Sequence, residues 1–331
     1  MANLTDVARA ARVSIATVSR VVNQPGTVKA ETRRRVAQAM ERLGYRPNRV
    51  ARRLRQRSGR RQLLGIIIPE IDNFHFAEIV RGVEEAAYER QFALILCNSE
   101  GDAAKQRFYL EVLRAESVDG IIAPPLRERD PLLLAAAADG LPIVTIDRRL
   151  ASRGVDSVVV DNGRGAELAV DRLIGRGCRA IGHIAGPLEV TTARERWEGW
   201  RRTLIARGIS PRADFVYWGD NRHESGAAGA RALLALAEAP QALFVGNNLM
   251  TAGALEAIHQ LGLKVPEDVA ILGFDDPPWA AALRPALTTI RQPTRKIGRL
   301  AVELLLRRLA EPDSPRTRLV LPPELLVRES A

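Results

Sequence analysis

The chain has 331 residues, 46% of them hydrophobic, enough to bury the core of one large and one small domain. It has no run of eighteen apolar residues, and its opening MANLTDVARAARVS lacks the apolar stretch of a signal peptide, so we expect neither a membrane span nor secretion. The two cysteines, Cys97 and Cys178, show no CxxC spacing, which argues against a disulfide framework or a zinc site and favours a reducing cytoplasm.

The net charge of +10 is concentrated at the beginning of the chain. Residues 1–61 hold 16 Lys and Arg and three acids, a net charge of +13, whereas the remaining 270 residues sum to −3. A purely solvated tail would lack hydrophobic periodicity, and this segment has it. A basic, folded head therefore predicts a polyanionic partner.

Three short helices are predicted in this head. Thr5 is placed to cap a helix that begins at residue 6, Ser14 to cap one over 15–22, and a third is expected over 31–43. The side chains expected to face inward are Val7, Ala8, Ala11, Val18, Val21, Val36, Met40 and Leu43. Two helices joined by a tight turn and completed by a third predict a helix-turn-helix domain.

The second of these helices carries residue types that suit a DNA major groove. Ile15, Ala16 and Arg20 share its outward face, where arginine can pair with guanine and the apolar side chains can touch a thymine methyl group. Thr17 and Ser19 suit phosphate oxygens. The alternative is a helix packed on both faces.

From Leu63 onward, short apolar runs alternate with amphipathic helices, and the alternation starts again after residue 160. Strands are expected at LLGIII, ALILC, GIIA, PIVTI, SVVV, AIGHIA, FVYW, ALFVG and VAILGF, and helices at 77–90, 105–115, 165–175, 194–207, 225–236 and 251–261. This pattern predicts two α/β subdomains with parallel sheets and a ligand site in the crevice at the carboxyl ends of the strands.

No catalytic motif accompanies this fold. The sequence lacks GxGxxG after its first strand, a phosphate-binding GxxxxGK[ST], GxSxG and HExxH, and its four histidines show no metal-ligand spacing. We therefore expect no catalytic residue, no cofactor and no metal. His75 could be a binding residue, although a surface or packing role is favoured for it.

The motifs TVSRVVN and YRPNRVARRL lie within residues 3–54, which resemble the DNA-binding head of the LacI/GalR family of bacterial repressors. The resemblance implies a hinge that becomes helical on the operator, with Leu54 entering the minor groove as an apolar wedge. The DNA-contacting residues it implies are Thr5, Ser14, Ile15, Ala16, Thr17, Ser19, Arg20, Asn23, Asn48, Arg49, Ala51 and Leu54.

Two positions depart from the family pattern. Arg12 stands where the family usually has a turn glycine, and a left-handed arginine costs roughly 1 kcal/mol. Lys29 replaces the usual serine cap of the third helix, which weakens that cap. Gly44 is expected to end the helix in a left-handed conformation.

The body resembles the periplasmic sugar-binding fold shared by the same repressors, most clearly at ILGFDDPPWAAALRPALTTIRQP. The resemblance implies an α/β protein with a helix-turn-helix domain, a hinge helix and a two-subdomain sensor with parallel sheets. The implied boundaries are 1–46 for the DNA-binding domain, 47–61 for the hinge and linker, and 62–330 for the sensor. Its N-subdomain would comprise 62–161 and 292–322, and its C-subdomain 162–291 and 323–330.

A small-molecule effector site is implied in the crevice of the sensor. Asp275 and Arg196 match the family's carboxylate and arginine that bind ligand hydroxyl groups, although the two might instead pair with each other. Asp147 ends a strand but would also serve as a cap. The effector residues are Phe74, Phe76, Asp147, Thr192, Arg196, Asn221, Asn247 and Asp275, with the two phenylalanines equally suited to the core. Trp218 and Trp279 favour packing.

Asn221 and Val190 occupy positions where purine-sensing relatives have an aromatic residue and an arginine, which favours a sugar or sugar derivative over a purine corepressor. Arg148, Arg194 and Arg196 would also suit a sugar acid or a phosphate, and the sequence does not choose among these ligands. The sequence thus predicts a cytoplasmic, homodimeric, allosteric repressor of a palindromic double-stranded operator, with no membrane partner. No leucine-heptad extension follows, so we expect no tetramer. The rival hypotheses are an α/β enzyme with a DNA-tethering head, a transport-type binding protein and a nonspecific architectural DNA-binding protein.

Overall fold

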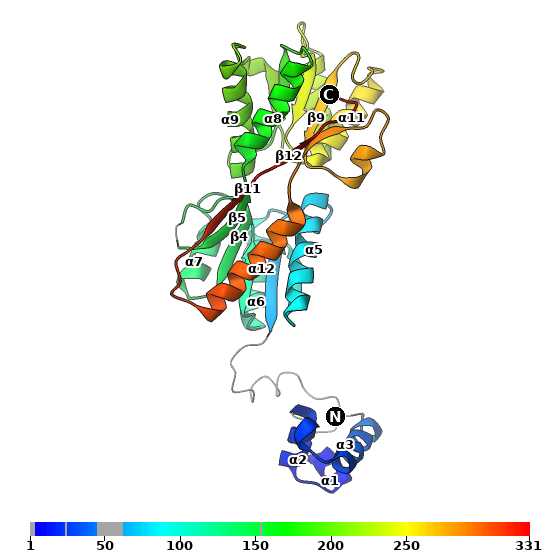
Figure 1. The fold of residues 1–331 in the computed structure, drawn as a ribbon, viewed down its shortest axis with the longest axis vertical. Coiled ribbons are helices and arrows are strands. Elements are labelled where there is room, and N and C mark those ends of the chain that lie inside the picture. Colours follow the sequence, from blue (N-terminus) through cyan, green and yellow to red (C-terminus); the bar gives the residue numbers. More distant parts are fainter. Residues whose placement is uncertain (1–3, 24, 45–61, 153) are drawn as a thin grey trace. The chain divides into compact units, whose positions relative to one another are not determined.

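The computed structural model describes residues 4–23, 25–44, 62–152 and 154–331. The chain folds as two compact units, Met1–Arg61 and Gln62–Ala331 (Figure 1). Among the described residues, no helix is both long enough and apolar enough to cross a bilayer.

The first unit contains helices α1 (Leu4–Ala11), α2 (Ile15–Asn23) and α3 (Ala30–Arg42), with a 3-10 turn at Pro25–Thr27. Its small core consists of Val7, Ala8, Ala11, Val18, Val36 and Ala39. Two predicted details are wrong. Thr5 lies inside the first turn of α1 rather than before it. Leu43 is 36% exposed because α3 ends at Arg42, and Ala39 takes the inward position instead.

The caps and turns of this unit follow the sequence closely. Ser14 Oγ accepts from Thr17 N at 3.1 Å, Lys29 gives α3 no side-chain cap, and Gly44 has φ +60°. Arg12 has the predicted positive φ, 50°. The Arg35 guanidinium supports this turn, because it donates to the carbonyl oxygens of Ala11 (2.6 Å) and Arg12 (3.1 Å).

The second unit has two lobes, each built on one six-stranded sheet. The N-lobe sheet has the order β11-β5-β4-β3-β1-β2, and all its strand pairs are parallel. Its strands are β1 (Leu63–Ile68), β2 (Ala93–Asn98), β3 (Gly120–Ala123), β4 (Ile143–Asp147), β5 (Asp156–Val160) and β11 (Arg318–Leu321). Its helices are α5 (Phe74–Glu89), α6 (Ala103–Ala115), α7 (Pro131–Ala138) and α12 (Thr294–Ala310).

The C-lobe sheet has the order β12-β10-β9-β8-β6-β7 and is parallel except for β12, which runs antiparallel to β10. Its strands are β6 (Ile181–Ala185), β7 (Val216–Trp218), β8 (Ala242–Val245), β9 (Ala270–Phe274), β10 (Thr288–Arg291) and β12 (Glu324–Leu326). Its helices are α8 (Asn162–Gly175), α9 (Thr191–Ala206), α10 (His223–Leu234) and α11 (Asn248–Gln260), with 3-10 turns at Ala213–Phe215 and Pro278–Ala281. The predicted parallel sheets are confirmed.

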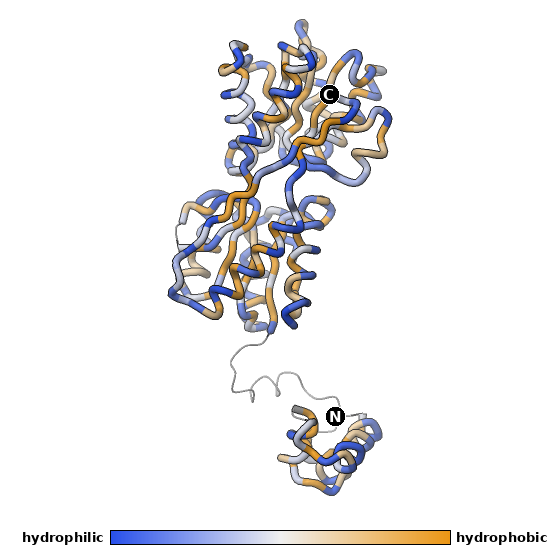
Figure 2. The backbone as a smooth tube through the Cα atoms, viewed as in Figure 1, coloured by the Kyte–Doolittle hydropathy of each residue, from blue (hydrophilic) through white to orange (hydrophobic). Residues whose placement is uncertain are grey.

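The chain passes between the lobes after β5, after β10 and after β11, as Figure 1 shows. Hydrophobic residues concentrate in the strands, whereas the helices alternate hydrophobic with hydrophilic residues (Figure 2). In each lobe two helices approach closely through glycine. A Cβ on Gly82 of α5 would lie 2.2 Å from the Arg295 carbonyl oxygen of α12, and one on Gly253 of α11 would lie 1.9 Å from the His223 carbonyl oxygen of α10.

Several helices begin about one turn before their predicted starts. Helix α5 begins at Phe74 rather than at residue 77, because Asn73 Oδ1 accepts from His75 N at 3.0 Å. Helix α11 begins at Asn248 rather than at residue 251, because Asn247 Oδ1 accepts from Met250 N at 2.8 Å. These asparagine caps bring additional polar side chains to the junction of the lobes.

Candidate effector-binding site and DNA-facing helix

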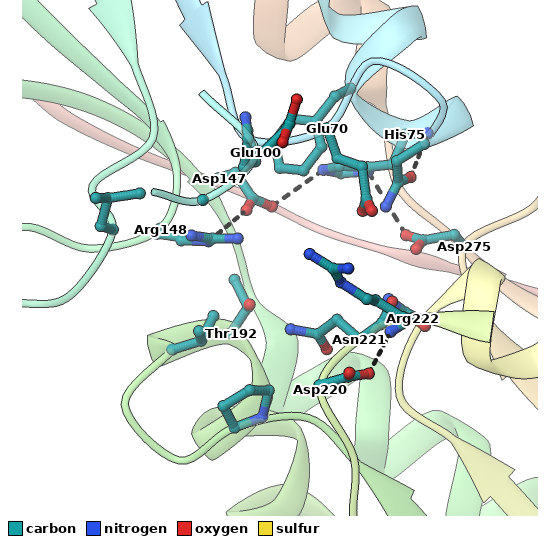
Figure 3. Close-up of a pocket in the computed structure, with 18 of the residues that line it drawn as sticks. Glu70, His75, Glu100, Asp147, Arg148, Thr192, Asp220, Asn221, Arg222 and Asp275 are labelled. Carbon is teal, nitrogen blue, oxygen red and sulfur yellow. Dashed lines mark hydrogen bonds and ion pairs between the residues drawn. The ribbon is translucent and has the colours of Figure 1, made fainter. Parts of the chain in front are cut away.

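A cavity of about 270 Å³ lies between the lobes, at the carboxyl ends of their strands. Its wall contains seven of the eight predicted effector residues, namely Phe76, Asp147, Thr192, Arg196, Asn221, Asn247 and Asp275. Phe74, the first residue of α5, is half-buried and does not line the cavity. Figure 3 shows side chains from both lobes facing this space.

Three of these polar residues adopt left-handed backbone conformations. Asp147 has φ 61°, Asp275 has φ 76° and Asn221 has φ 71°. Each lies at or just after the end of a strand, at β4, β9 and β7 respectively. Aspartate and asparagine tolerate this region better than most residues, but it still carries strain, which clusters at functional sites.

His75 is the centre of a buried charge cluster in the cavity wall, so a surface role for it is wrong, whereas its role as a binding residue stays a prediction. Its Nε2 lies 3.0 Å from Asp147 Oδ1, and its Nδ1 lies 3.5 Å from Asp275 Oδ1 and 3.3 Å from Gln292 Nε2 (Figure 3). Since Asp147 and His75 belong to the N-lobe and Asp275 to the C-lobe, a protonated His75 joins the two lobes electrostatically.

The pKa shifts follow from this arrangement. Burial lowers the pKa of His75, but the charge of Asp275 and the hydrogen bond to Asp147 outweigh burial, and the net pKa is raised. Burial raises the pKa of Asp147, yet His75, Arg148 and Arg196 bring it down to about 2. Both ring nitrogens of His75 face these side-chain partners, so the imidazole is suited to holding the carboxylates rather than to general base catalysis.

Arg196 lines the floor of the cavity without pairing with Asp275. Its Nε donates to Asn162 Oδ1 at 2.9 Å and its Nη1 to the Gly246 carbonyl oxygen at 2.6 Å, and its guanidinium lies 3.6 Å from the Phe274 ring centroid. Within the described ranges no ion pair joins Arg196 to Asp275, so the two do not pair with each other. Both residues line the cavity, each held there by other partners.

Some of the polar and aromatic residues around the crevice also cap a helix or pack in the core. Asp147 caps no helix, since it accepts from His75. Asn247 does cap α11, and its Nδ2 donates to the Asn221 carbonyl oxygen at 2.8 Å, so its side chain shapes the wall. Phe76 is only 4% exposed and packs in the N-lobe core while also lining the cavity. Trp218 and Trp279 do not line it.

The sequence analysis missed four charged residues of the cavity wall, Glu70, Glu100, Asp220 and Arg222. Burial raises the pKa of Glu70 despite the nearby Arg222, and burial lowers the pKa of Arg148 despite Asp147 and Glu70. All four lie just beyond strand ends, which was the available signal, since strand ends meet at the crevice.

Several contacts connect the lobes around the cavity. Asn248 Nδ2 donates to Asn73 Oδ1 at 2.9 Å, and Arg149 N donates to Thr191 Oγ1 at 3.0 Å. Ion pairs join Arg149 to Glu195 and Arg194 to Glu128. The first turn of α9 thus holds Thr192, which lines the cavity, beside Thr191 and Arg194, which contact the other lobe.

The outer face of α2 has the composition expected for groove contact. Ile15 is 45% exposed, Ala16 and Arg20 are exposed, and Val18 on the opposite face is fully buried. This one-sided burial excludes a helix packed on both faces. Of the other predicted DNA-contacting residues, Thr5 and Ser14 are exposed, Thr17 and Ser19 are half-buried, and Asn23 ends α2. Asn48, Arg49, Ala51 and Leu54 lie outside the described residues.

Comparison with known proteins gives consistent results along the whole chain. A family model described as bacterial regulatory proteins, lacI family, matches residues 3–48, and one for a periplasmic binding protein-like domain matches residues 170–331. The HTH-type transcriptional repressor PurR of Aliivibrio salmonicida (strain LFI1238) is 36% identical over 331 residues, covering 100% of this chain and 99% of the relative. The ribose operon repressor of Escherichia coli (strain K12) is 36% identical over 341 residues, covering 100% of both.

Solved structures agree with these sequence relatives. The Lac repressor dimer bound to operator and the anti-inducer ONPF has a TM-score of 0.86 and 31% identity, with 99% of this chain and 98% of that chain covered. The complex of the transcriptional regulator CelR with cellobiose has a TM-score of 0.77 and 34% identity, with 100% of both chains covered.

Proposed function

The chain belongs to the LacI family of bacterial regulatory proteins, and from this premise we propose that its effector is a sugar or sugar derivative bound in the cavity between the lobes. It is a DNA-binding transcriptional regulator of the repressor type, controlled by a small molecule. The proposal concerns the effector class and the residues that serve each step.

The observation that carries the sugar assignment is the composition of the cavity wall. Phe76 is its one phenyl or indole side chain in the described part of the chain, and that side chain is 4% exposed. A purine bound here would find no aromatic side chain to stack on, and Val190 would offer it no charged donor. Asp147, Asp275 and Arg196 offer acceptors and donors side by side, which suits vicinal hydroxyl groups that do both. A volume of about 270 Å³ suits a ligand of monosaccharide size.

A purine corepressor is the second candidate, because the PurR relative is as similar as the ribose operon repressor, at 36% identity each. The positions that distinguish a purine site from a sugar site are those of Val190 and Asn221, which line the cavity here. A polar Asn221 gives no stacking face, and Val190 gives no donor for a purine carbonyl group.

We assign residues 1–46 to operator binding, 47–61 to a hinge and linker, and 62–330 to effector binding and dimerisation. Two copies place two α2 helices on the half-sites of a palindrome, mirroring the two-fold axis of the dimer. Effector binding changes the cross-lobe contacts, and operator affinity changes with them. The proposal includes no catalysed reaction, and because the partner is chromosomal DNA it places the protein in the cytoplasm.

Selection of operators from a random DNA pool by the full chain tests the DNA-binding part of this proposal. We expect a palindrome, and a loss of about 1–3 kcal/mol of base discrimination at one position of each half-site for Arg20→Ala. Arg42→Ala, which removes the same charge from the end of α3, is the matched control. Equal loss on cognate and random DNA for Arg20→Ala would reduce Arg20 to a phosphate contact.

A further inference from the structure

A second hollow, of about 300 Å³, lies in the N-lobe on the face of the sheet formed by β4, β5 and β11. Its wall consists of Thr145, Arg149, Leu150, Ser152, Val155, Ser157, Arg316, Thr317 and Arg318. Thr145 pairs with Ser157, and Ser157 with Arg318, across three parallel strands. Paired residues point to the same face, so these polar side chains form one row. Their neighbours Val144 and Val158 point to the opposite face, into the core beneath α12 and α5.

The wall of this hollow is positive. It has three arginines and four hydroxyl side chains but no carboxylate, whereas the cavity between the lobes is lined by five carboxylates. Arg316 is held by carbonyl oxygens, with its Nε 2.9 Å from the Gly154 oxygen and its Nη1 3.1 Å from the Pro312 oxygen, so its charge is not neutralised by an acid. The Arg318 side chain is exposed and makes no hydrogen bond or ion pair with any residue that the structure describes.

The nearest acidic groups do not cancel this charge. Asp156 is 1% exposed, and its Oδ2 accepts from Arg308 Nε at 3.0 Å, while Arg307 lies 3.6 Å from its Oδ1. Arg149 itself is paired with Glu195 of α9. Arg316 and Arg318 are thus the cations left to bind a ligand, and guanidinium groups beside hydroxyl donors suit a tetrahedral oxyanion.

We propose that this hollow is a second binding site, for the phosphate group of a small phosphate monoester, and that it is coupled to the cavity between the lobes. The volume of about 300 Å³ exceeds what a bare phosphate fills, which leaves room for the organic part of the ester. Arg316 and Arg318 hold the phosphate, and Ser157 and Thr317 donate to its oxygens.

Arg149 provides the coupling, because it lines the hollow and contacts the other lobe. Glu195, its partner, accepts from Asn162 Nδ2 at 3.0 Å, and Asn162 Oδ1 accepts from Arg196 Nε at 2.9 Å. A chain of charged and hydrogen-bonded groups therefore runs from the hollow to the floor of the cavity. A phosphate in the hollow competes with Glu195 for Arg149, and by linkage the occupant of either site alters affinity at the other.

Calorimetric titration of the full chain at constant ionic strength tests the site, with glucose 6-phosphate, inorganic phosphate and glucose as probes. We expect glucose 6-phosphate to bind more tightly than inorganic phosphate and glucose not to bind here. Arg318→Gln should weaken glucose 6-phosphate binding about tenfold, the loss of one charge-assisted contact. Arg81→Gln, which removes the same charge from a side chain on α5 that is 61% exposed, should leave binding unchanged.

The basic head is identical in these variants, so phosphate bound there contributes equally to each and cannot produce a difference. Equal affinity of Arg318→Gln, Arg81→Gln and the unchanged protein would overturn the site, and so would the absence of binding. Equal binding of inorganic phosphate and glucose 6-phosphate would overturn the assignment to an ester.

Glu195→Gln tests the coupling separately. The amide still accepts from Asn162, but it releases Arg149, so glucose 6-phosphate should bind about fivefold more tightly if the competition exists. Unchanged affinity would refute the coupling. Glucose 6-phosphate is itself a sugar derivative, so any binding in the cavity between the lobes is the part that Arg318→Gln leaves unchanged. Failure of the proposed effector class would appear in tests of that cavity and would leave the difference between Arg318→Gln and Arg81→Gln intact.

Discussion

Replacing His75 with glutamine should destabilise the two-lobed unit by about 3 kcal/mol near neutral pH, because it removes the cation between two buried carboxylates. Opposite unit charges about 4 Å apart attract by roughly 4 kcal/mol at an effective dielectric constant of about 20, and the burial cost of the imidazolium offsets part of this. The relevant separations are 3.0 Å to Asp147 and 3.5 Å to Asp275.

The stability that His75 contributes depends on pH. The pKa of His75 is raised in the folded protein, so its contribution is complete below 6.5, its unfolded value, and is lost as pH rises through the folded pKa. Asp147, with a pKa of about 2 against 3.8 unfolded, contributes above 3.8, and this is lost only as pH falls through about 2.

The penalty of His75→Gln should therefore be larger at about pH 5, where the contribution of His75 is complete, than at about pH 9. Urea unfolding followed by tryptophan fluorescence measures it, since all four tryptophans, at 197, 200, 218 and 279, belong to the two-lobed unit. His259→Gln, an exposed position on α11, is the control and should show no penalty. A penalty that is equal at both pH values would refute the charge-cluster argument.

Three further substitutions test the packing of the chain. Gly253→Ala should cost about 2 kcal/mol or more in urea unfolding, because its Cβ would lie 1.9 Å from the His223 carbonyl oxygen and force α10 and α11 apart, and an unaffected midpoint would contradict this. Arg308→Met should cost about 3–5 kcal/mol in urea unfolding by leaving Asp156 buried without its closest cation, and an unchanged stability would contradict this. Arg35→Ala should cost the head about 1–2 kcal/mol by removing two bonds to the end of α1, seen as faster amide exchange over residues 4–13, with the exposed Arg34→Ala unchanged.

The elements with strong local signals are predictable from the sequence. Alternating apolar runs locate the parallel strands, and Ser14 and Gly44 mark helix ends through cap chemistry that involves only neighbouring residues. The place of the cavity and seven of its lining residues are also predictable, because strand ends of parallel sheets converge on one crevice.

The remaining details depend on groups distant in the chain. The role of His75 is hidden in the sequence because its partners Asp147 and Asp275 follow it by 72 and 200 positions, and no local pattern brings them together. The orientation of Arg196 is set by Asn162 and the Gly246 carbonyl oxygen, which reach it through three-dimensional packing. The helix starts differ by one turn because an asparagine cap and a loop asparagine look the same in a sequence.

Thermal unfolding of the full chain with single sugars, sugar acids and purine bases tests the effector assignment most directly. A ligand at about 100 times its dissociation constant should stabilise the protein by roughly 2.7 kcal/mol, a clear rise in melting temperature. We predict that a sugar or sugar derivative gives this shift and that Asp275→Ala abolishes it. A shift produced by a purine base, with none from any sugar, would contradict the account and would show that Val190 and Asn221 accommodate a purine.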